Sequence, residues 1–181
     1  CQALWWTTWR KAGILGPFAT AERGSAVFET PENLELHFAE GAPPIDWGAI
    51  FGREAPNAIE IGAGNGYFIE NEAARLPDWN FVAIEREREF YWKMVKRCWR
   101  RGLTNVRSTS DDAFDVLGNC IPDRSIARIY LYFSDPWPKR KHAKRRVFGE
   151  EFLALAERLL APGGEVWFKT DVGWYFNLAI A

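Results

Sequence analysis

Residues 58–66 read Ala-Ile-Glu-Ile-Gly-Ala-Gly-Asn-Gly, and this stretch decides the fold class of the chain. Its first four residues, Ala58 to Ile61, have the short apolar pattern of a buried strand. Gly62 to Gly66 make a glycine-rich turn, and a helical pattern then runs from Tyr67 to Leu76, where Pro77 ends it. A strand, a glycine-rich turn and a helix in this order predict the first unit of a parallel α/β sheet.

The alternation of strands and helices continues along the rest of the chain. We expect strands over 81–84, from 105, over 126–133 and over 165–169, and helices over 87–101, 113–119 and 147–160. Right-handed crossovers between such elements give a doubly wound, mostly parallel α/β sheet. We expect one domain over 58–181, and an N-terminal extension over 1–57 that packs on this domain or is partly disordered.

One predicted loop concentrates positive charge. Six of the nine residues over 138–146 are Lys or Arg, whereas the whole chain has a formal net charge of −1. This loop follows the strand over 126–133, and sites in open α/β sheets form at the carboxyl ends of strands. A charge run alone is more often a solvated surface. Because Asp135-Pro136-Trp137 opens this one, the pattern favours a site that acts on a polyanion.

Several kinds of protein are disfavoured by the composition. No stretch approaches about 18 consecutive apolar residues, so we expect no membrane span. Cys1, Cys98 and Cys120 lack a C-x-x-C spacing and the chain has only two His, so we expect no metal site. Because no signal-peptide pattern is present, we expect a cytoplasmic protein.

The spacing within the glycine-rich turn indicates a particular cofactor. A dinucleotide fingerprint, G-x-G-x-x-G, would require a glycine where this chain has Tyr67. The observed E-x-G-x-G-x-G resembles instead motif I of the S-adenosylmethionine-dependent methyltransferases, whose sheet is Rossmann-like. The resemblance implies that Glu60, Gly62, Gly64 and Gly66 bind S-adenosylmethionine.

Two acids at later strand ends extend this prediction. Glu85 ends the second strand, where a carboxylate can accept hydrogen bonds from both ribose hydroxyls of a nucleoside. Asp112 follows the third strand and resembles the acid that meets the adenine amino group, although the adjacent Asp111 could take this place. Each acid could alternatively be a helix N-cap or a solvated carboxylate.

The chain then resembles one family, the tRNA (guanine-N7)-methyltransferases, from about residue 58 to 171. The family string D-P-W-x-K-x-x-H-x-K-R-R is matched at every fixed position by residues 135–146, and Thr170-Asp171 matches the family's T-D. Ser134 stands where the family usually has Pro. The family's T-x-x-E motif and its last strands do not occur in these residues, so we expect a domain truncated at its C-terminus.

The resemblance implies methyl transfer from S-adenosylmethionine to N7 of a guanine in the variable loop of tRNA, with no metal. It implies that Asp135 is the catalytic carboxylate and also meets the cofactor. The residues that it implies for tRNA binding are Lys139, Lys141, His142, Lys144, Arg145, Arg146 and Asp171. Trp137 could stack on the target base or pack the loop against the sheet.

Two other functions are open at this point. One is a methyltransferase for another substrate, which would not need six cations in one loop. The other is a catalytically silent RNA-binding module, against which the intact Glu60, Glu85 and Asp135 argue. The protein could be a monomer or a homodimer.

Overall fold

The computed structural model describes residues 34–38, 41, 43–139, 141–142 and 146–180. In this part of the chain five strands form one sheet in the order β3-β2-β1-β4-β5, with every neighbouring pair parallel. The strands are β1 (Asn57–Ile61), β2 (Asn80–Ile84), β3 (Val106–Thr109), β4 (Ile126–Tyr132) and β5 (Leu160–Lys169). The strand order reverses between β1 and β4, which confirms the doubly wound α/β fold.

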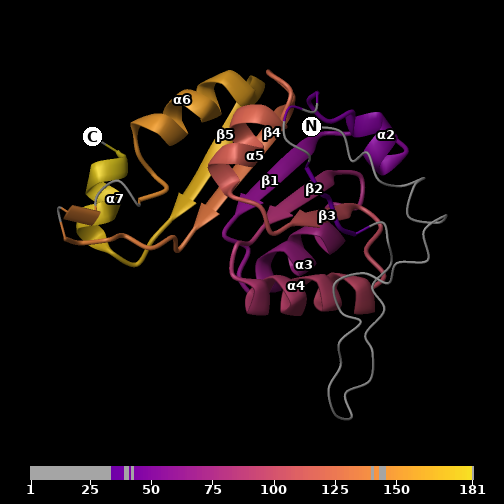
Figure 1. The fold of residues 1–181 in the computed structure, drawn as a ribbon, viewed down its shortest axis with the longest axis horizontal. Coiled ribbons are helices and arrows are strands. Elements are labelled where there is room, and N and C mark those ends of the chain that lie inside the picture. The colour runs from indigo at the N-terminus through magenta and orange to yellow at the C-terminus, as the bar shows by residue number, and fades with distance from the viewer. Residues whose placement is uncertain (1–33, 39–40, 42, 140, 143–145, 181) are drawn as a thin grey trace, which may run out of the picture.

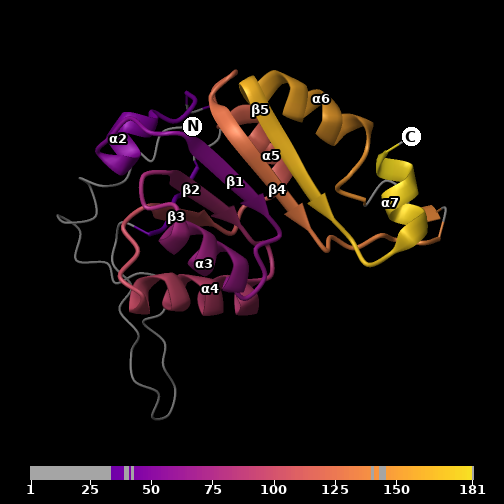
Figure 2. The same ribbon diagram turned by 180° about the vertical axis from the view of Figure 1, so that it is seen from behind.

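Helices cover both faces of the sheet (Figures 1 and 2). The helices are α2 (Trp47–Phe51), α3 (Tyr67–Arg75), α4 (Arg88–Arg100), α5 (Ala113–Asn119), α6 (Glu150–Leu159) and α7 (Gly173–Ala179). α3 and α4 pack on one face, around a core that includes Ile69, Phe81 and Met94. α5 and α6 pack on the other, around Ile59 and Phe152. The central strands β1 and β2 are therefore buried on both sides, as their apolar sequences predict, whereas β5 at the edge is partly exposed.

Part of the N-terminal region adds to the same cores. Leu34, Leu36, Ile45 and Trp47 are all buried. Backbone hydrogen bonds join Leu34 and Leu36 to Ser108 in β3, each with a donor–acceptor distance of 2.7 Å. Residues 1–33 of the predicted extension lie outside the described part of the chain.

The start of β5 differs from the prediction. We expected a helix over 147–160 and a strand over 165–169, but α6 begins at Glu150 and β5 begins at Leu160. The pairing of β5 with β4 shifts register between Ile126 and Arg128, so the extra residues form an irregular stretch of strand. A Cβ on Gly164 would lie 2.8 Å from the carbonyl oxygen of Ile126, and this close approach explains a glycine there.

A buried amide holds the end of α3 onto the sheet, and this contact is testable. Asn105 donates to the carbonyl oxygens of Ala73, Leu76 and Trp79 at 3.0–3.2 Å. Because Asn105→Ala removes the side-chain donor shared by these carbonyls, we expect it to lower the free energy of unfolding by about 1–3 kcal/mol. Urea denaturation monitored by circular dichroism measures this loss. Asn71→Ala, which removes an exposed amide on the same helix, should change stability by less than about 0.5 kcal/mol.

Candidate cofactor and substrate site

The candidate site lies where the strand order reverses. β1 and β4 are neighbours in the sheet, and the helices that follow them pack on opposite faces. In open α/β sheets, ligand sites lie beyond the carboxyl ends of two strands arranged in this way. β1 leads into the glycine-rich turn, and β4 leads into the basic loop over 138–146. In Figure 1 the arrowheads of β4 and β5 point toward α7 and this loop.

The glycine-rich turn has the backbone conformation that its composition predicts. Gly62, Gly64 and Gly66 have φ angles of +73°, +56° and +80°, a region that favours glycine. A Cβ on Gly66 would lie 2.8 Å from the Cα of Met94, so this position also requires glycine for packing. No atom lies within 4 Å of a Cβ built on Gly62 or Gly64, which leaves room for a ligand beside the backbone.

Glu85 is fixed at the end of β2 by two backbone donors. The N–H of Gly64 donates to its Oε2 at 2.7 Å, and the N–H of Glu87 donates to its Oε1 at 2.8 Å. A carboxylate has about four acceptor positions, so each oxygen can accept a further hydrogen bond. Glu85 thus links the glycine-rich turn to the end of β2 and can still receive two hydroxyl donors.

Glu60 is the most perturbed acid of the site. Its side chain lies in β1, its residue is only 3% exposed, and within the described chain its Oε2 has no hydrogen-bond partner. Burial, together with the negative charge of Glu85, raises the pKa of the Glu60 carboxyl to about 8. A buried acceptor without a partner fits a cationic or hydrogen-bonding group of a ligand.

A second buried polar atom without a described partner comes from Tyr132 at the end of β4. Its hydroxyl oxygen has none of the described hydrogen bonds, while its ring packs on Phe68 with centroids 4.7 Å apart. Burial raises the pKa of the Tyr132 hydroxyl, and the charge of Glu72 adds to this. The sequence pattern presents Tyr132 only as a residue of a buried strand, so nothing in it singles out this hydroxyl.

The two aspartates after β3 have different surroundings. Asp112 is the N-cap of α5, accepting from the N–H of Phe114 at 2.9 Å, and it also pairs with Arg86 at 3.0 Å. Asp111 is exposed and accepts from the hydroxyl of Thr109 at 2.8 Å. The capping role that we considered for these acids therefore exists for Asp112, and its adenine contact stays a prediction.

β4 and β5 bring two further carboxylates to one edge of the sheet. The N–H of Phe133 donates to the carbonyl oxygen of Lys169 at 2.8 Å, so the strands remain paired to their ends. Asp135 and Asp171 each follow two residues later, and both are exposed. Phe133 has a φ of +53°, an unusual conformation for a bulky residue and one typical of functional sites.

Arg146 organises the basic loop. Its guanidinium donates to the carbonyl oxygens of Pro136 and Trp137, at 2.9 and 3.0 Å, and lies 4.9 Å from the ring centroid of Trp174. The ring of Trp137 lies beside that of His142, with centroids 5.6 Å apart. Arg146 thus has a structural role that its place in a run of cations does not reveal.

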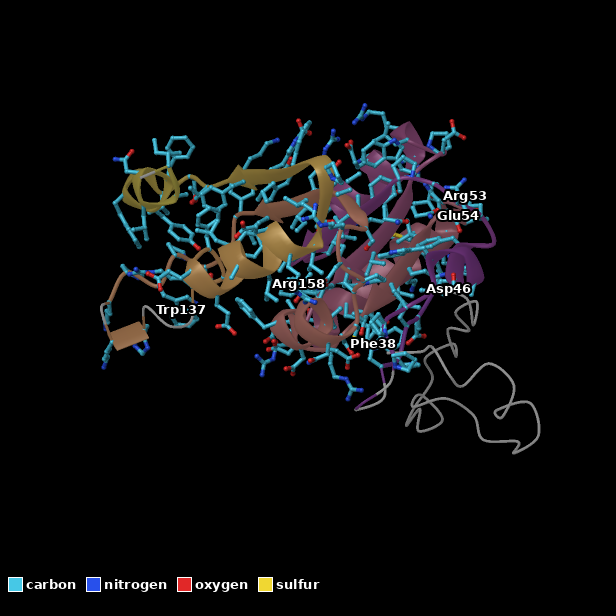
Figure 3. The ribbon with its side chains drawn as sticks, turned by 90° about the horizontal axis from the view of Figure 1, so that it is seen from above. Phe38, Asp46, Arg53, Glu54, Trp137 and Arg158 are labelled. Carbon is cyan, nitrogen blue, oxygen red and sulfur yellow. The ribbon has the colours of Figure 1, made fainter. Side chains whose placement is uncertain are left out.

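The other cations of the loop that we predicted to bind tRNA either are exposed or lie outside the residues that the structure describes. Lys139 and Lys141 are exposed, whereas Lys144 and Arg145 lie outside the described residues. Figure 3 shows Trp137 at the end of the molecule next to α7, opposite Arg53 and Glu54 near α2. Trp137, directly before this loop, therefore lies at the α7 end of the molecule and not at the α2 end.

Tyr175 is a residue of this region that the sequence does not reveal. It is fully buried in α7, and its hydroxyl accepts from the N–H of Phe148 at 3.1 Å and lies 3.5 Å from the Ser134 hydroxyl. Its ring meets Phe168 of β5 edge-on. Tyr175 joins α7, the loop after β4 and the segment before α6, a set of contacts that only the tertiary structure creates.

Within the described residues, no group of three or more His, Cys, Asp or Glu side chains is arranged to hold a metal ion. None of the described helices combines the length and the apolar character needed to cross a membrane.

The raised pKa of Glu60 makes stability depend on pH. The folded protein holds the proton of Glu60 up to about pH 8, whereas the unfolded chain releases it near 4.5. Glu60 therefore makes its full contribution to the free energy of unfolding below pH 4.5. This contribution falls as the pH rises to 8, by at most about 1.4 kcal/mol per pH unit. Glu60→Gln should remove this fall and stabilise the free protein at pH 7.5. Urea midpoints at pH 5.5 and 7.5 test this, and an equal pH dependence in both proteins would contradict it.

Comparisons with known proteins identify the family of the chain. A family model described as "Putative methyltransferase" matches residues 54–181. The tRNA (guanine-N(7)-)-methyltransferase of Staphylococcus epidermidis is 40% identical over 150 residues, which cover 83% of this chain and 68% of the relative. That of Alcanivorax borkumensis is 45% identical over 123 residues, which cover 68% of this chain and 52% of the relative. The matched segments thus span between about half and two thirds of these relatives.

A solved structure supports the fold alone. The precorrin-6Y C5,15-methyltransferase of Geobacter metallireducens GS-15 superposes with a TM-score of 0.55 at 16% identity, covering 73% of this chain and 66% of that one. The family model covers most of the described domain, and the Staphylococcus epidermidis relative is matched over two thirds of its length. The chain belongs to the tRNA (guanine-N7)-methyltransferase family.

Proposed function

We propose that the protein transfers the methyl group of S-adenosylmethionine to N7 of a guanine in the variable loop of tRNA, giving 7-methylguanosine. The observation that carries this proposal is that two segments leave neighbouring strands at the same edge of the sheet. The glycine-rich turn with Glu60 and Glu85 extends from one side, and the basic loop opened by Asp135 extends from the other. The names of the relatives supply the particular base and the RNA class.

The residues around the turn fit S-adenosylmethionine. Glu85 would accept from the ribose hydroxyls, and Asp112 would meet the adenine. Glu60 would face the amino-acid end, whose ammonium suits a buried carboxylate that lacks a described partner. Gly62 and Gly64 would let the backbone approach the cofactor. The bound cofactor supplies a methyl group already activated by the positive charge on sulfur.

Methylation of guanine N7 requires positioning more than proton transfer. N7 carries a lone pair and no proton at neutral pH, so no general base is needed, and alignment of the two reactants dominates. The base becomes positive as the methyl group arrives. A carboxylate at its Watson–Crick edge, accepting from N1–H and N2–H, would orient the base and stabilise this charge. We assign this role to Asp135, with Asp171 as a second carboxylate on the same edge.

The basic loop would bind the tRNA backbone. Lys139, Lys141, His142, Lys144 and Arg145 would contact phosphates and position the RNA without reading its sequence. Arg146 would contribute through the loop conformation that its two carbonyl contacts maintain, as well as through its charge. Because tRNA is the proposed partner, we also propose that the protein acts in the cytoplasm.

A direct assay tests the proposed function. The protein is incubated with S-adenosylmethionine labelled on its methyl group and with unmodified tRNA, and the labelled nucleoside is identified after digestion. We expect 7-methylguanosine at one position in the variable loop. Label on another nucleoside, or on none, would contradict the proposal. The affinity for tRNA, measured at several salt concentrations, separates the two functions. If tRNA were not the substrate, we would expect this affinity to lack the steep decrease with salt that a polycationic loop produces.

Asp135 should affect the chemical step more than tRNA affinity. Asp135→Asn keeps the size of the side chain but places a donor where the base needs an acceptor. We expect the single-turnover rate at saturating tRNA and cofactor to fall by about 10²–10³. The dissociation constant for tRNA should change little. Asp115→Asn, at an exposed position in α5, is the matched control and should retain the wild-type rate. A near wild-type rate for Asp135→Asn would contradict this role for Asp135, and Asp171 would then be the candidate for the carboxylate that orients the base.

A further inference from the structure

α4 touches the glycine-rich turn at two points. At Met94 the helix backbone lies so close to Gly66 that a Cβ on this glycine would meet the Met94 Cα at 2.8 Å. One helical turn later, the Nε of Arg97 donates to the carbonyl oxygen of Asn65 at 3.1 Å. Residues three apart lie on the same face of a helix, so α4 presents both groups to the turn together.

Three contacts fix the guanidinium of Arg97. Besides its bond to Asn65, its Nη1 pairs with Oε2 of Glu70 at 3.1 Å. Its carbon Cζ lies 3.6 Å from the ring centroid of Tyr67. Tyr67 and Glu70 both belong to the first turn of α3, which follows the glycine-rich turn directly. Arg97 therefore spans the junction between the turn and α3.

The turn is held from two sides. On the β2 side, the N–H of Gly64 donates to Glu85 at 2.7 Å. On the α4 side, the carbonyl oxygen of the next residue, Asn65, accepts from Arg97 at 3.1 Å. Gly62, Gly64 and Gly66 have wide conformational freedom, so the sequence of the turn does not restrict it to one conformation. The turn has one backbone hydrogen bond of its own, from the N–H of Gly66 to the carbonyl oxygen of Ala63 at 3.0 Å, and contacts from β2 and α4 add further restriction.

We propose that Arg97 is a positioning residue for cofactor binding, which holds the turn over 62–66 in the conformation that receives the cofactor. This inference rests on the proposed function, because it takes S-adenosylmethionine as the ligand of the turn. Arg97 acts through the Asn65 carbonyl and so restricts the peptide groups on both sides of it. Without this contact the free turn would sample more conformations. Cofactor binding would then have to order the turn, and this loss of conformational entropy would lower the affinity for the cofactor.

Arg101, the residue that follows the end of α4, offers a matched control. It pairs with the same Glu70, at 3.3 Å, and donates to Asn71 at 3.2 Å. Both of its partners lie in α3, beyond the turn. Partly exposed ion pairs of this kind contribute little to stability. Replacing either arginine should therefore weaken the contact between α3 and α4 to a similar, small extent, whereas only Arg97 bonds to the turn.

The test compares cofactor binding in Arg97→Met, Arg97→Lys and Arg101→Met, with S-adenosylhomocysteine as an unreactive probe in titration calorimetry. We expect the dissociation constant to rise roughly tenfold for Arg97→Met, the size typical of a lost bond to a charged group. Arg97→Lys keeps a donor and a charge and should recover most of this loss. Arg101→Met should stay within about twofold of wild type. Thermal unfolding should give similar midpoints for the two Met variants.

A kinetic measurement separates positioning from a general structural role. At saturating cofactor the single-turnover methylation rate of Arg97→Met should approach wild type, whereas at low cofactor it should fall in step with the lost affinity. Equal affinities in Arg97→Met and Arg101→Met would overturn the inference, and so would a loss in Arg97→Lys as large as in Arg97→Met. Failure of the proposed function differs, because the wild-type protein itself would then not bind the probe or methylate tRNA.

Discussion

The parallel pairing of β1 with β4 is the constraint on which the site depends. Residues Ala58 to Ile61 pair with Arg128 to Leu131, and the chain leaves these two neighbouring strands toward opposite sides of the sheet. Helices on both faces bury the central strands, so a ligand can approach them at their carboxyl ends. The glycine-rich turn and the Asp135 loop, far apart in sequence, leave the same edge of the sheet from neighbouring strands because of this one pairing.

The site stores several unfavourable features that the rest of the fold compensates. Glu60 is buried with a strongly raised pKa, and a carboxylate beside it opposes its ionisation. Phe133 and Trp137 adopt left-handed backbone conformations, with φ of +53° and +43°, at the end of β4 and in its loop. Buried polar groups without described partners and strained backbone are typical of sites prepared for a ligand. The two well-packed cores on the faces of the sheet supply the stability that tolerates them.

Local patterns predicted the parts of this structure that local physics determines. The glycine-rich turn, the five strands and the helix over 113–119 follow from apolar runs, glycine conformations and capping residues, and the structure confirms them. The predicted start of β5 was wrong, because the irregular pairing of β5 with β4 depends on a close backbone approach at Gly164. The contacts of Tyr175 and Arg97 were not predicted, because each joins segments that the sequence separates. For the same reason, the sequence pattern located Asp112 after β3 but did not show which group its side chain binds.

The separation of β1 and β4 in the sequence also bears on how the protein folds. Two strands and three helices lie in the chain between Ile61 and Ile126, so the central pairing joins segments that are far apart in the sequence. Long-range parallel pairings of this kind are entropically costly and form slowly. A newly made chain whose β4 has not yet joined β1 already carries the positive charge of residues 138–146 but has no complete cofactor crevice. Under the proposed function, such a chain would attract RNA before it could modify it, and the cofactor would stabilise only the chain in which the sheet is complete.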